Sequence, residues 1–220
     1  MRVAIIDDDE TARGFIADLM TGKGHLGVQF PNGRAGMSGL QRDTFDLLFV
    51  DWNMPGMTGI ELMRWARESL DPCPAIIMMT SRSDKGDVIE GLEAGADDFI
   101  VKPERGDVVD ARVEALMRRT APKAVASRIE DFGDYAFDNL NSSVAFRGEV
   151  AELTAKEFTL AKLFFDNLHR PLSRAYLLET VWHSVADLPT RTLDVHVSKV
   201  RAKLQLRPEN GYRLQTVFGF

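Results

Sequence analysis

Five polar side chains with complementary chemistry follow short apolar runs of the sequence, each where a run ends. They are Asp7 and Asp8 after residues 3–6, Asp51 after 47–50, Thr80 after 75–79 and Lys102 after 99–101. Carboxylates brought together repel one another unless a cation neutralises them. Carboxylate oxygens with open coordination positions suit Mg²⁺, which completes its shell with water and phosphate oxygens. A lysine and a hydroxyl group beside such a site suit a bound phosphoryl group.

The apolar pattern predicts the elements that would position these residues. Short apolar runs bounded by turn residues are typical of strands buried on both faces. Helical spacing lies between the runs, and after Asp51 the Pro55–Gly56 turn leads to a capping box of Thr58 and Glu61. We predict an α/β fold over residues 1–119, with five strands alternating with five helices in a doubly wound parallel sheet. The carboxyl ends of such strands meet at one edge, so the five side chains are expected to share one crevice.

Four segments of this region resemble the receiver domain of bacterial two-component response regulators: IIDDDE, FVDWNMPGMTG, MMTSR and DDFIVKP. The resemblance implies that a histidine kinase phosphorylates Asp51. It implies a Mg²⁺ site made by Asp7, Asp8, Asp51 and the backbone carbonyl of Asn53. Lys102 would pair with the phosphoryl group, while Thr80 and Phe99 would act as switch residues.

The run of three aspartates allows two registers for the metal-binding pair. We prefer Asp7 with Asp8, because that register places four apolar residues on the expected core positions, namely Phe15, Ile16, Leu19 and Met20. We also predict that the Lys102–Pro103 peptide bond is cis, since Lys102 must turn back into the crevice directly after a strand.

The resemblance also implies that two receivers pair on phosphorylation, through the face made by the fourth helix, fifth strand and fifth helix. The charged residues of this face are Asp98, expected opposite Arg112, and Asp97, expected opposite Arg119. Val88 and Val108 stand where the family pattern has a lysine facing a glutamate. We expect an apolar contact there in place of an exposed ion pair.

Charge is distributed unevenly along the chain. Residues 1–120 hold 14 Lys and Arg against 21 Asp and Glu, whereas residues 121–220 hold 13 against 12. An acidic first half and a locally basic second half indicate two domains with different partners. The Ala-rich stretch 120–130 is predicted as the linker, and 131–220 as the second domain. The single cysteine, Cys73, and the lack of a signal-like or membrane-length apolar stretch favour a cytoplasmic protein without membrane contact.

The second domain begins with short apolar runs and turn residues over 132–151, which predict a small antiparallel sheet. Helices are predicted after a second capping box, Thr154 with Glu157, and after Ser173. A third helix at about 190–204 has a narrow apolar arc, typical of a core face, made of Leu193, Val197, Val200 and Leu204. Its outward half carries Arg191, Thr192, His196, Lys199 and Lys203. Such a helix fits the major groove of DNA, although a solvated basic face gives the same charge pattern.

Residues 153–182 and 191–204 resemble the winged-helix output domain of OmpR/PhoB-type regulators. The resemblance implies an α+β winged-helix domain that binds double-stranded DNA, with contacts from Arg191, Thr192, His196, Ser198, Lys199, Arg201, Lys203 and Arg213. Ser198 stands where many relatives carry arginine, and Phe218 stands where a minor-groove arginine is common. A wing strand is expected at Tyr212–Phe218, without the return strand of other family members.

Two other functions fit part of this pattern. A haloacid-dehalogenase-like phosphatase also uses a strand-end aspartate with Mg²⁺, but it requires a second carboxylate two residues later, where this chain has Asn53. A DNA-binding protein whose receiver serves only for dimerisation would not need the five strand-end residues together. A third alternative is that the five residues merely cap the ends of their strands and have no shared function, but this would not explain why five side chains with complementary chemistry occur at these positions. We therefore expect a phosphorylation-controlled, dimerising transcription regulator and not an enzyme.

Overall fold

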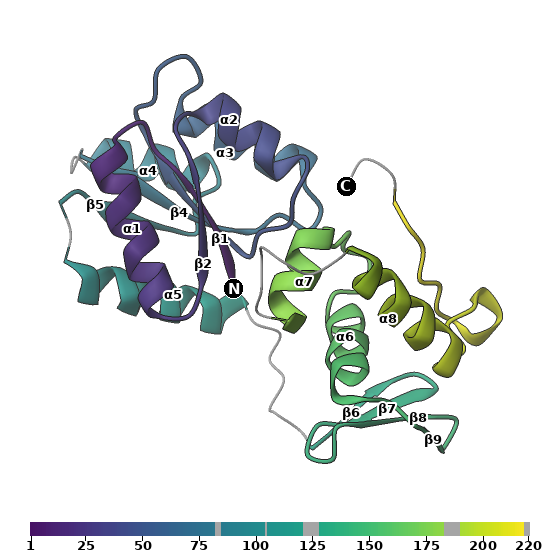
Figure 1. The fold of residues 1–220 in the computed structure, drawn as a ribbon. Helices are drawn as coiled ribbons and strands as arrows, with labels where there is room; N and C mark the ends of the chain where they lie inside the picture. The colour runs from purple at the N-terminus through teal and green to yellow at the C-terminus, as the bar shows by residue number, and fades with distance from the viewer. Residues whose placement is uncertain (82–84, 104, 121–127, 183–189, 218–220) are drawn as a thin grey trace. The chain divides into compact units, whose positions relative to one another are not determined.

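The protein consists of two compact units, Met1–Pro122 and Lys123–Phe220, shown in the computed structural model of Figure 1. The structure describes residues 1–81, 85–103, 105–120, 128–182 and 190–217. Each unit has hydrophobic core clusters made only of its own residues. Among the described helices, none is long and apolar enough to cross a membrane.

The first unit is the predicted doubly wound sheet (Figure 1). Its parallel strands are β1 (Arg2–Ile6), β2 (Leu26–Phe30), β3 (Leu47–Asp51), β4 (Ala75–Thr80) and β5 (Asp98–Val101), in the order β2-β1-β3-β4-β5. The helices are α1 (Glu10–Gly22), α2 (Gly33–Leu40), α3 (Gly59–Ser69), α4 (Lys85–Glu93) and α5 (Gly106–Thr120). Helices α1 and α5 cover one face of the sheet, and α2, α3 and α4 cover the other. The predicted alternation of five strands and five helices is confirmed.

Burial on both faces explains why the sequences of β1, β3 and β4 are almost continuously apolar. Strands β1, β3 and β4 are buried at every position. Their register aligns Ile6 with Val50, and Val50 with Met78. Consequently the residues that follow, Asp7 and Asp51 among them, emerge at the same edge of the sheet.

Helix α2 lies unusually close to its neighbours at three glycines. A Cβ atom there would lie under 3.0 Å from another atom, a separation that real Cβ atoms essentially never show. The distances are 2.7 Å at Gly33 to the carbonyl oxygen of Met57, 2.9 Å at Gly36 to Ile6 and 2.3 Å at Gly39 to the ring of Phe30. Side chains larger than hydrogen at these positions would therefore push the helix off the sheet.

The second unit begins with the predicted antiparallel sheet. Its strands are β6 (Ile129–Phe132), β7 (Tyr135–Asp138), β8 (Ser143–Phe146) and β9 (Glu149–Ala151), paired in sequence order. Helices α6 (Ala155–Asp166), α7 (Arg174–Trp182) and α8 (Thr190–Lys203) follow, then a short 3₁₀ helix, η1 (Pro208–Asn210). Tyr135 links the sheet to the end of α8, because its buried hydroxyl donates to the carbonyl oxygen of Leu204 at 2.8 Å.

Two details of the second unit differ from the sequence prediction. Strand β6 begins at Ile129, so the last two residues of the predicted linker, 129–130, belong to the sheet. The predicted wing strand is absent from the described residues Tyr212–Val217, where no backbone pairing with another strand occurs; Phe218 lies outside the described part of the chain. A strand forms only when a partner supplies its backbone hydrogen bonds.

Candidate functional site

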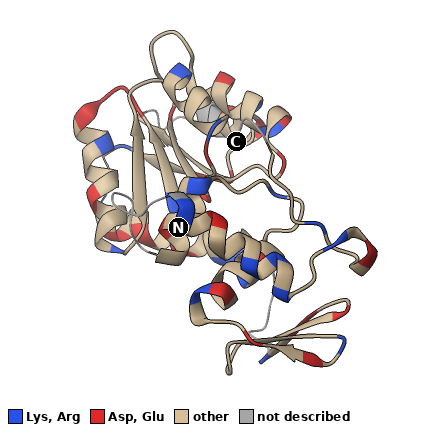
Figure 2. Ribbon diagram, turned by 45° about the vertical axis from the view of Figure 1, so that its right-hand side comes forward, with Lys and Arg blue, Asp and Glu red and all other residues tan. Residues whose placement is uncertain are grey.

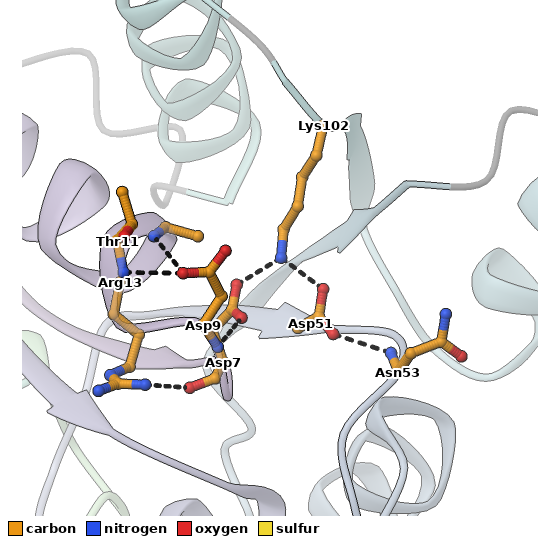
Figure 3. A network of polar contacts seen from close by, with 8 residues as sticks. Asp7, Asp9, Thr11, Arg13, Asp51, Asn53 and Lys102 are labelled. Atoms are coloured by element: carbon orange, nitrogen blue, oxygen red, sulfur yellow. Dashed lines mark hydrogen bonds and ion pairs between the residues drawn. The ribbon is translucent and has the colours of Figure 1, made fainter.

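Lys102 brings two of the strand-end carboxylates together (Figure 3). Its Nζ atom lies 2.5 Å from Asp7 Oδ2 and 2.6 Å from Asp51 Oδ1. Asp7 is completely buried and Asp51 is 6% exposed. The three side chains come from the ends of β1, β3 and β5, so the parallel sheet itself positions them.

A third carboxylate, Asp8, completes an acidic cluster at this edge. One oxygen from each of Asp7, Asp8 and Asp51 lies within 4.8 Å of the others, which is suitable for a shared metal ion. The backbone N–H of Asn53 donates to Asp51 Oδ2 at 2.9 Å, so the Asn53 backbone borders the same pocket. Hard oxygen donors with one exposed member fit Mg²⁺, which retains several water ligands.

Asp9 has a different role, although it continues the same acidic run. It is the N-cap of α1, and its side chain accepts hydrogen bonds from the backbone N–H groups of Thr11 and Ala12 (Figure 3). Helix capping therefore uses Asp9 and leaves Asp7 and Asp8 for the pocket. This geometry supports the preferred register of the aspartate run.

Burial and charge act against each other in this pocket. Burial raises the pKa of Asp51 above its usual value, and the hydrogen bond and charge of Lys102 only partly offset it. Burial alone would lower the pKa of Lys102, but the hydrogen bonds and charges of Asp51 and Asp7 outweigh it and raise that pKa. Lys102 is thus firmly protonated and acts as a fixed positive charge between two acids.

The expected switch residues lie on the two strands β4 and β5, which lead to this pocket. Thr80 is 1% exposed at the end of β4, and its carbonyl oxygen accepts from the Lys102 N–H at 2.7 Å. Phe99 is half-buried, and the Arg112 guanidinium lies 5.7 Å from its ring centroid. The Lys102–Pro103 bond is cis, as predicted.

The charged residues of the expected dimer face are already paired in part within one chain. Arg112 Nη1 lies 3.0 Å from Asp98 Oδ1. Asp97 accepts from Arg67 and from the Ile76 N–H, both at 2.7 Å, so its carboxylate is engaged by its own receiver. Arg119 is exposed and Val108 is half-buried, whereas the Val88 side chain lies outside the described part of the chain.

Helix α8 has the predicted apolar and polar faces. Leu193, Val200 and Leu204 are buried, while the outward positions Arg191, Ser198, Lys199 and Arg201, and Arg213 in the segment beyond, are exposed. Figure 2 shows the Lys and Arg positions of this unit in blue. His196 is half-buried, and its Nδ1–H donates a 2.8 Å hydrogen bond to the carbonyl oxygen of Thr192, which is also half-buried. The His196 ring also meets that of Trp182 edge-on at 5.1 Å.

Lys203 departs from the predicted outward role. Its Nζ atom lies 2.8 Å from Glu157 Oε2 and 2.8 Å from the carbonyl oxygen of Glu152. Glu157 is 1% exposed and forms the capping box of α6 with Thr154. The lysine therefore ties α8 to the start of α6. The capping box was visible in the sequence, but its partner 46 residues away has no local signal.

Arg13 makes a second long side-chain contact, after that of Lys203, which the sequence did not indicate. Its Nη1 atom donates to the backbone carbonyl oxygen of Asp7 at 2.7 Å (Figure 3). This bond holds the chain at the point where β1 passes into the acidic pocket.

Comparisons with known proteins agree with this geometry. Residues 3–114 match the family described as response regulator receiver domain, and residues 148–220 match transcriptional regulatory protein, C terminal. The transcriptional regulatory protein AfsQ1 of Streptomyces coelicolor is 34% identical over 98% of this chain and 94% of its own length. The phosphate regulon transcriptional regulatory protein PhoB of Pseudomonas aeruginosa is 33% identical over 97% of each chain.

Solved structures give the same result. The structure of DrrB from Thermotoga maritima, described as an OmpR/PhoB homologue, aligns with a TM-score of 0.50 and 26% identity over 99% of this chain and 95% of that chain. A Francisella response regulator receiver domain aligns with a TM-score of 0.51 and 28% identity over 54% of this chain and 98% of that domain. With a receiver matched in the first unit and a transcriptional regulatory domain in the second, the chain belongs to the OmpR/PhoB-type response regulators.

Proposed function

We propose that Asp51 is the phosphoacceptor of this regulator and that Asp7, Asp8, Asp51 and the carbonyl oxygen of Asn53 hold Mg²⁺. The observation that supports this most directly is the position of Lys102 between Asp7 and Asp51. Family members act as phosphoacceptors and DNA-binding regulators rather than as enzymes, and a receiver domain implies a phosphodonor such as a histidine kinase. We infer that such a kinase supplies the phosphoryl group here.

The phosphoryl transfer requires little covalent chemistry from the protein. An oxygen of Asp51 forms the bond to phosphorus while the bond between phosphorus and the donor nitrogen breaks, and the electron pair leaves with that nitrogen. No general base is needed, because the carboxylate is already ionised at neutral pH. Lys102 is placed to stabilise the negative charge of the transferred group. When bound, Mg²⁺ supplies further positive charge beside the same group.

We propose that α8 is the helix that enters the major groove, with Arg191, Lys199 and Arg201 at its exposed surface. Thr192, His196 and Ser198 lie on the same helix, and Arg213 lies in the segment beyond it. The exposed, charged side chains of Arg191, Lys199, Arg201 and Arg213 suit contacts to phosphates and base edges. Lys203 is better described as a support for this helix than as a DNA contact, because Glu157 already engages it.

We further propose that phosphorylation pairs two receivers through the face of α4, β5 and α5. Pairing would let two output domains address two half-sites. Val88 and Val108 would make an apolar contact, while Asp98, Arg112, Asp97 and Arg119 would contribute charge around it. Because Asp97 is bonded to Arg67 and Asp98 to Arg112 within the same chain, both carboxylates would have to exchange partners to pair across the dimer.

A labelling experiment tests the proposed phosphoacceptor. The full chain is incubated with Mg²⁺ and a labelled acyl phosphate, and intact-mass measurement counts the groups bound. We expect stable labelling of the chain and none of Asp51→Asn. Continuous turnover would indicate a phosphatase instead, and labelling of Asp51→Asn would contradict the assignment of this residue.

A further inference from the structure

Trp52 directly follows the proposed phosphoacceptor, and its side chain lies in the core beneath α4. The side chain is 6% exposed and packs in the cluster that joins the sheet to α2, α3 and α4. Its backbone is held on both sides, because the Trp52 N–H donates to Met79 and the Gly59 N–H donates to the Trp52 carbonyl, at 2.9 and 3.0 Å. A movement at Asp51 therefore reaches this indole through an otherwise fixed segment.

Gly91 is the point at which α4 meets that indole. A Cβ atom at Gly91 would lie 3.1 Å from the Cζ3 atom of Trp52, and 2.3 and 2.5 Å from Cε and Sδ of Met78. Met78 is completely buried, so other core side chains already surround its thioether group. The helix thus sits against Trp52 and Met78 at a position that accepts no side chain without a shift.

Both contacting residues are linked to the pocket by short stretches of strand. Trp52 is one residue beyond Asp51, and Met78 is two residues before Thr80 on the adjacent strand. Two strands that end in the pocket therefore meet the same position of α4. On the outer side of this helix, Ile89 and Leu92 are 55% and 44% exposed. A shift of α4 would change the apolar surface that the receiver presents.

We propose that Trp52, Met78 and Gly91 couple the state of Asp51 to the position of α4, with Gly91 as a positioning residue. This coupling rests on the proposed phosphorylation of Asp51. The glycine allows close contact, so a small displacement of the indole or thioether is passed to the helix and not absorbed in a gap. Packed interfaces shift between discrete arrangements instead of deforming continuously, which suits such a relay.

The test uses the full chain with Trp65→Phe and Trp182→Phe, so that Trp52 is the only tryptophan. Mg²⁺ with beryllofluoride serves as the phosphoryl analogue, and the fluorine-19 resonance of the bound analogue reports uptake independently of Trp52. Trp52 emission and sedimentation report the two expected responses. Gly91→Ala is compared with Gly14→Ala, a matched change in α1 where nothing lies within 4 Å of the new Cβ.

Allosteric coupling commonly corresponds to about 5- to 150-fold in affinity. We expect the analogue to strengthen self-association at least about fivefold in the unmodified chain and in Gly14→Ala, and to lose most of that effect in Gly91→Ala although it is still taken up. Adding Met78→Val to Gly91→Ala removes the Sδ and Cε atoms that the new methyl group meets, and should restore the response. Should Gly91→Ala fail to fold, Trp52→Phe is the second test, because its smaller ring withdraws from Gly91 and should weaken the sedimentation response.

Three results would overturn parts of this reasoning in distinguishable ways. Responses in Gly91→Ala equal to those of Gly14→Ala would refute the coupling while leaving phosphorylation of Asp51 intact. A double variant as impaired as Gly91→Ala would show that the loss does not arise at Met78, and would also refute it. An unmodified chain that takes up no analogue would overturn the proposed phosphoacceptor, and the coupling with it.

Discussion

Replacing Lys203 by methionine separates two roles that its place on α8 allows, a contact to DNA and a link between helices. Methionine retains much of the aliphatic stem but removes the ammonium group that lies 2.8 Å from Glu157. The Glu157 side chain is 2% exposed and Lys203 is 37% exposed. Removing Lys203 therefore leaves a buried carboxylate whose remaining hydrogen-bond partner among the described residues is Thr154, in the capping box.

The magnitude follows from this burial. Removing one partner of a fully buried ion pair costs about 3–5 kcal/mol. Water reaches Lys203 here, so we expect a smaller loss of about 2 kcal/mol, typical of one hydrogen bond to a charged group. A unit of this size loses about 4–8 °C in melting temperature per kcal/mol, so the second unit should melt roughly 8–16 °C lower.

The dependence of this effect on pH has a definite sign. Burial alone would raise the pKa of Glu157, but the hydrogen bonds from Lys203 and Thr154 outweigh it, and the pKa falls below its usual 4.5. A lowered carboxyl pKa stabilises the fold above the unfolded pKa and loses that effect as pH falls through the folded pKa. The difference in stability between the unmodified chain and Lys203→Met should therefore shrink below about pH 4.5.

Calorimetry of the full chain and DNA binding at several salt concentrations form the assay. Lys199→Met is the control, because Lys199 is exposed on the same helix with no ion pair among the described residues. It should leave the melting temperature unchanged and reduce the slope of log affinity against log salt by about 0.9. The opposite result would be an unchanged melting temperature in Lys203→Met together with a slope of log affinity against log salt that falls by about one. That result would refute the role of Lys203 as a link between α8 and α6.

Mg²⁺ should change Trp52 emission, because Trp52 directly follows Asp51 in the chain; an identical change in a Trp52→Phe chain would show that another tryptophan responds. Gly59→Ala should lower the free energy of unfolding of the receiver by at least about 3 kcal/mol in chemical denaturation, since its Cβ would lie 2.1 Å from the carbonyl oxygen of Asp51. The control Gly14→Ala should leave that free energy undiminished, because nothing lies within 4 Å of its Cβ. Val88→Lys should weaken the dimer formed with beryllofluoride, and a further Val108→Glu should restore it, as measured by sedimentation. An unchanged dimer in Val88→Lys would place the interface elsewhere.

The receiver was predictable because its signals are local. Buried parallel strands give continuous apolar runs, and a parallel sheet brings the residues after those runs to one edge. That logic placed Asp7, Asp51 and Lys102 together without any knowledge of distances. It also identified the Thr58–Glu61 capping box, which the structure forms with both hydrogen bonds.

Contacts between distant residues were not predictable in the same way. The outward arc of α8 included Lys203 because helical spacing shows only which side a residue faces, not whether another helix supplies an acid there. Asp97 likewise lay on the expected dimer face, but Arg67 from α3 engages it. The wing strand that the family resemblance implied is absent from the described residues 212–217 for a related reason, since a strand forms only beside a partner.

Helix α2 has a consequence for the local stability of the receiver. Three of its eight residues are glycine, and each glycine weakens a helix by about 0.8–1.0 kcal/mol relative to alanine. An isolated segment of this length and composition would not be helical. Its conformation is therefore imposed by Ile6, Phe30 and Met57, which occupy the space that side chains would otherwise fill. Amide hydrogens of α2 should accordingly exchange with solvent whenever the helix lifts from the sheet, without unfolding of the remaining receiver.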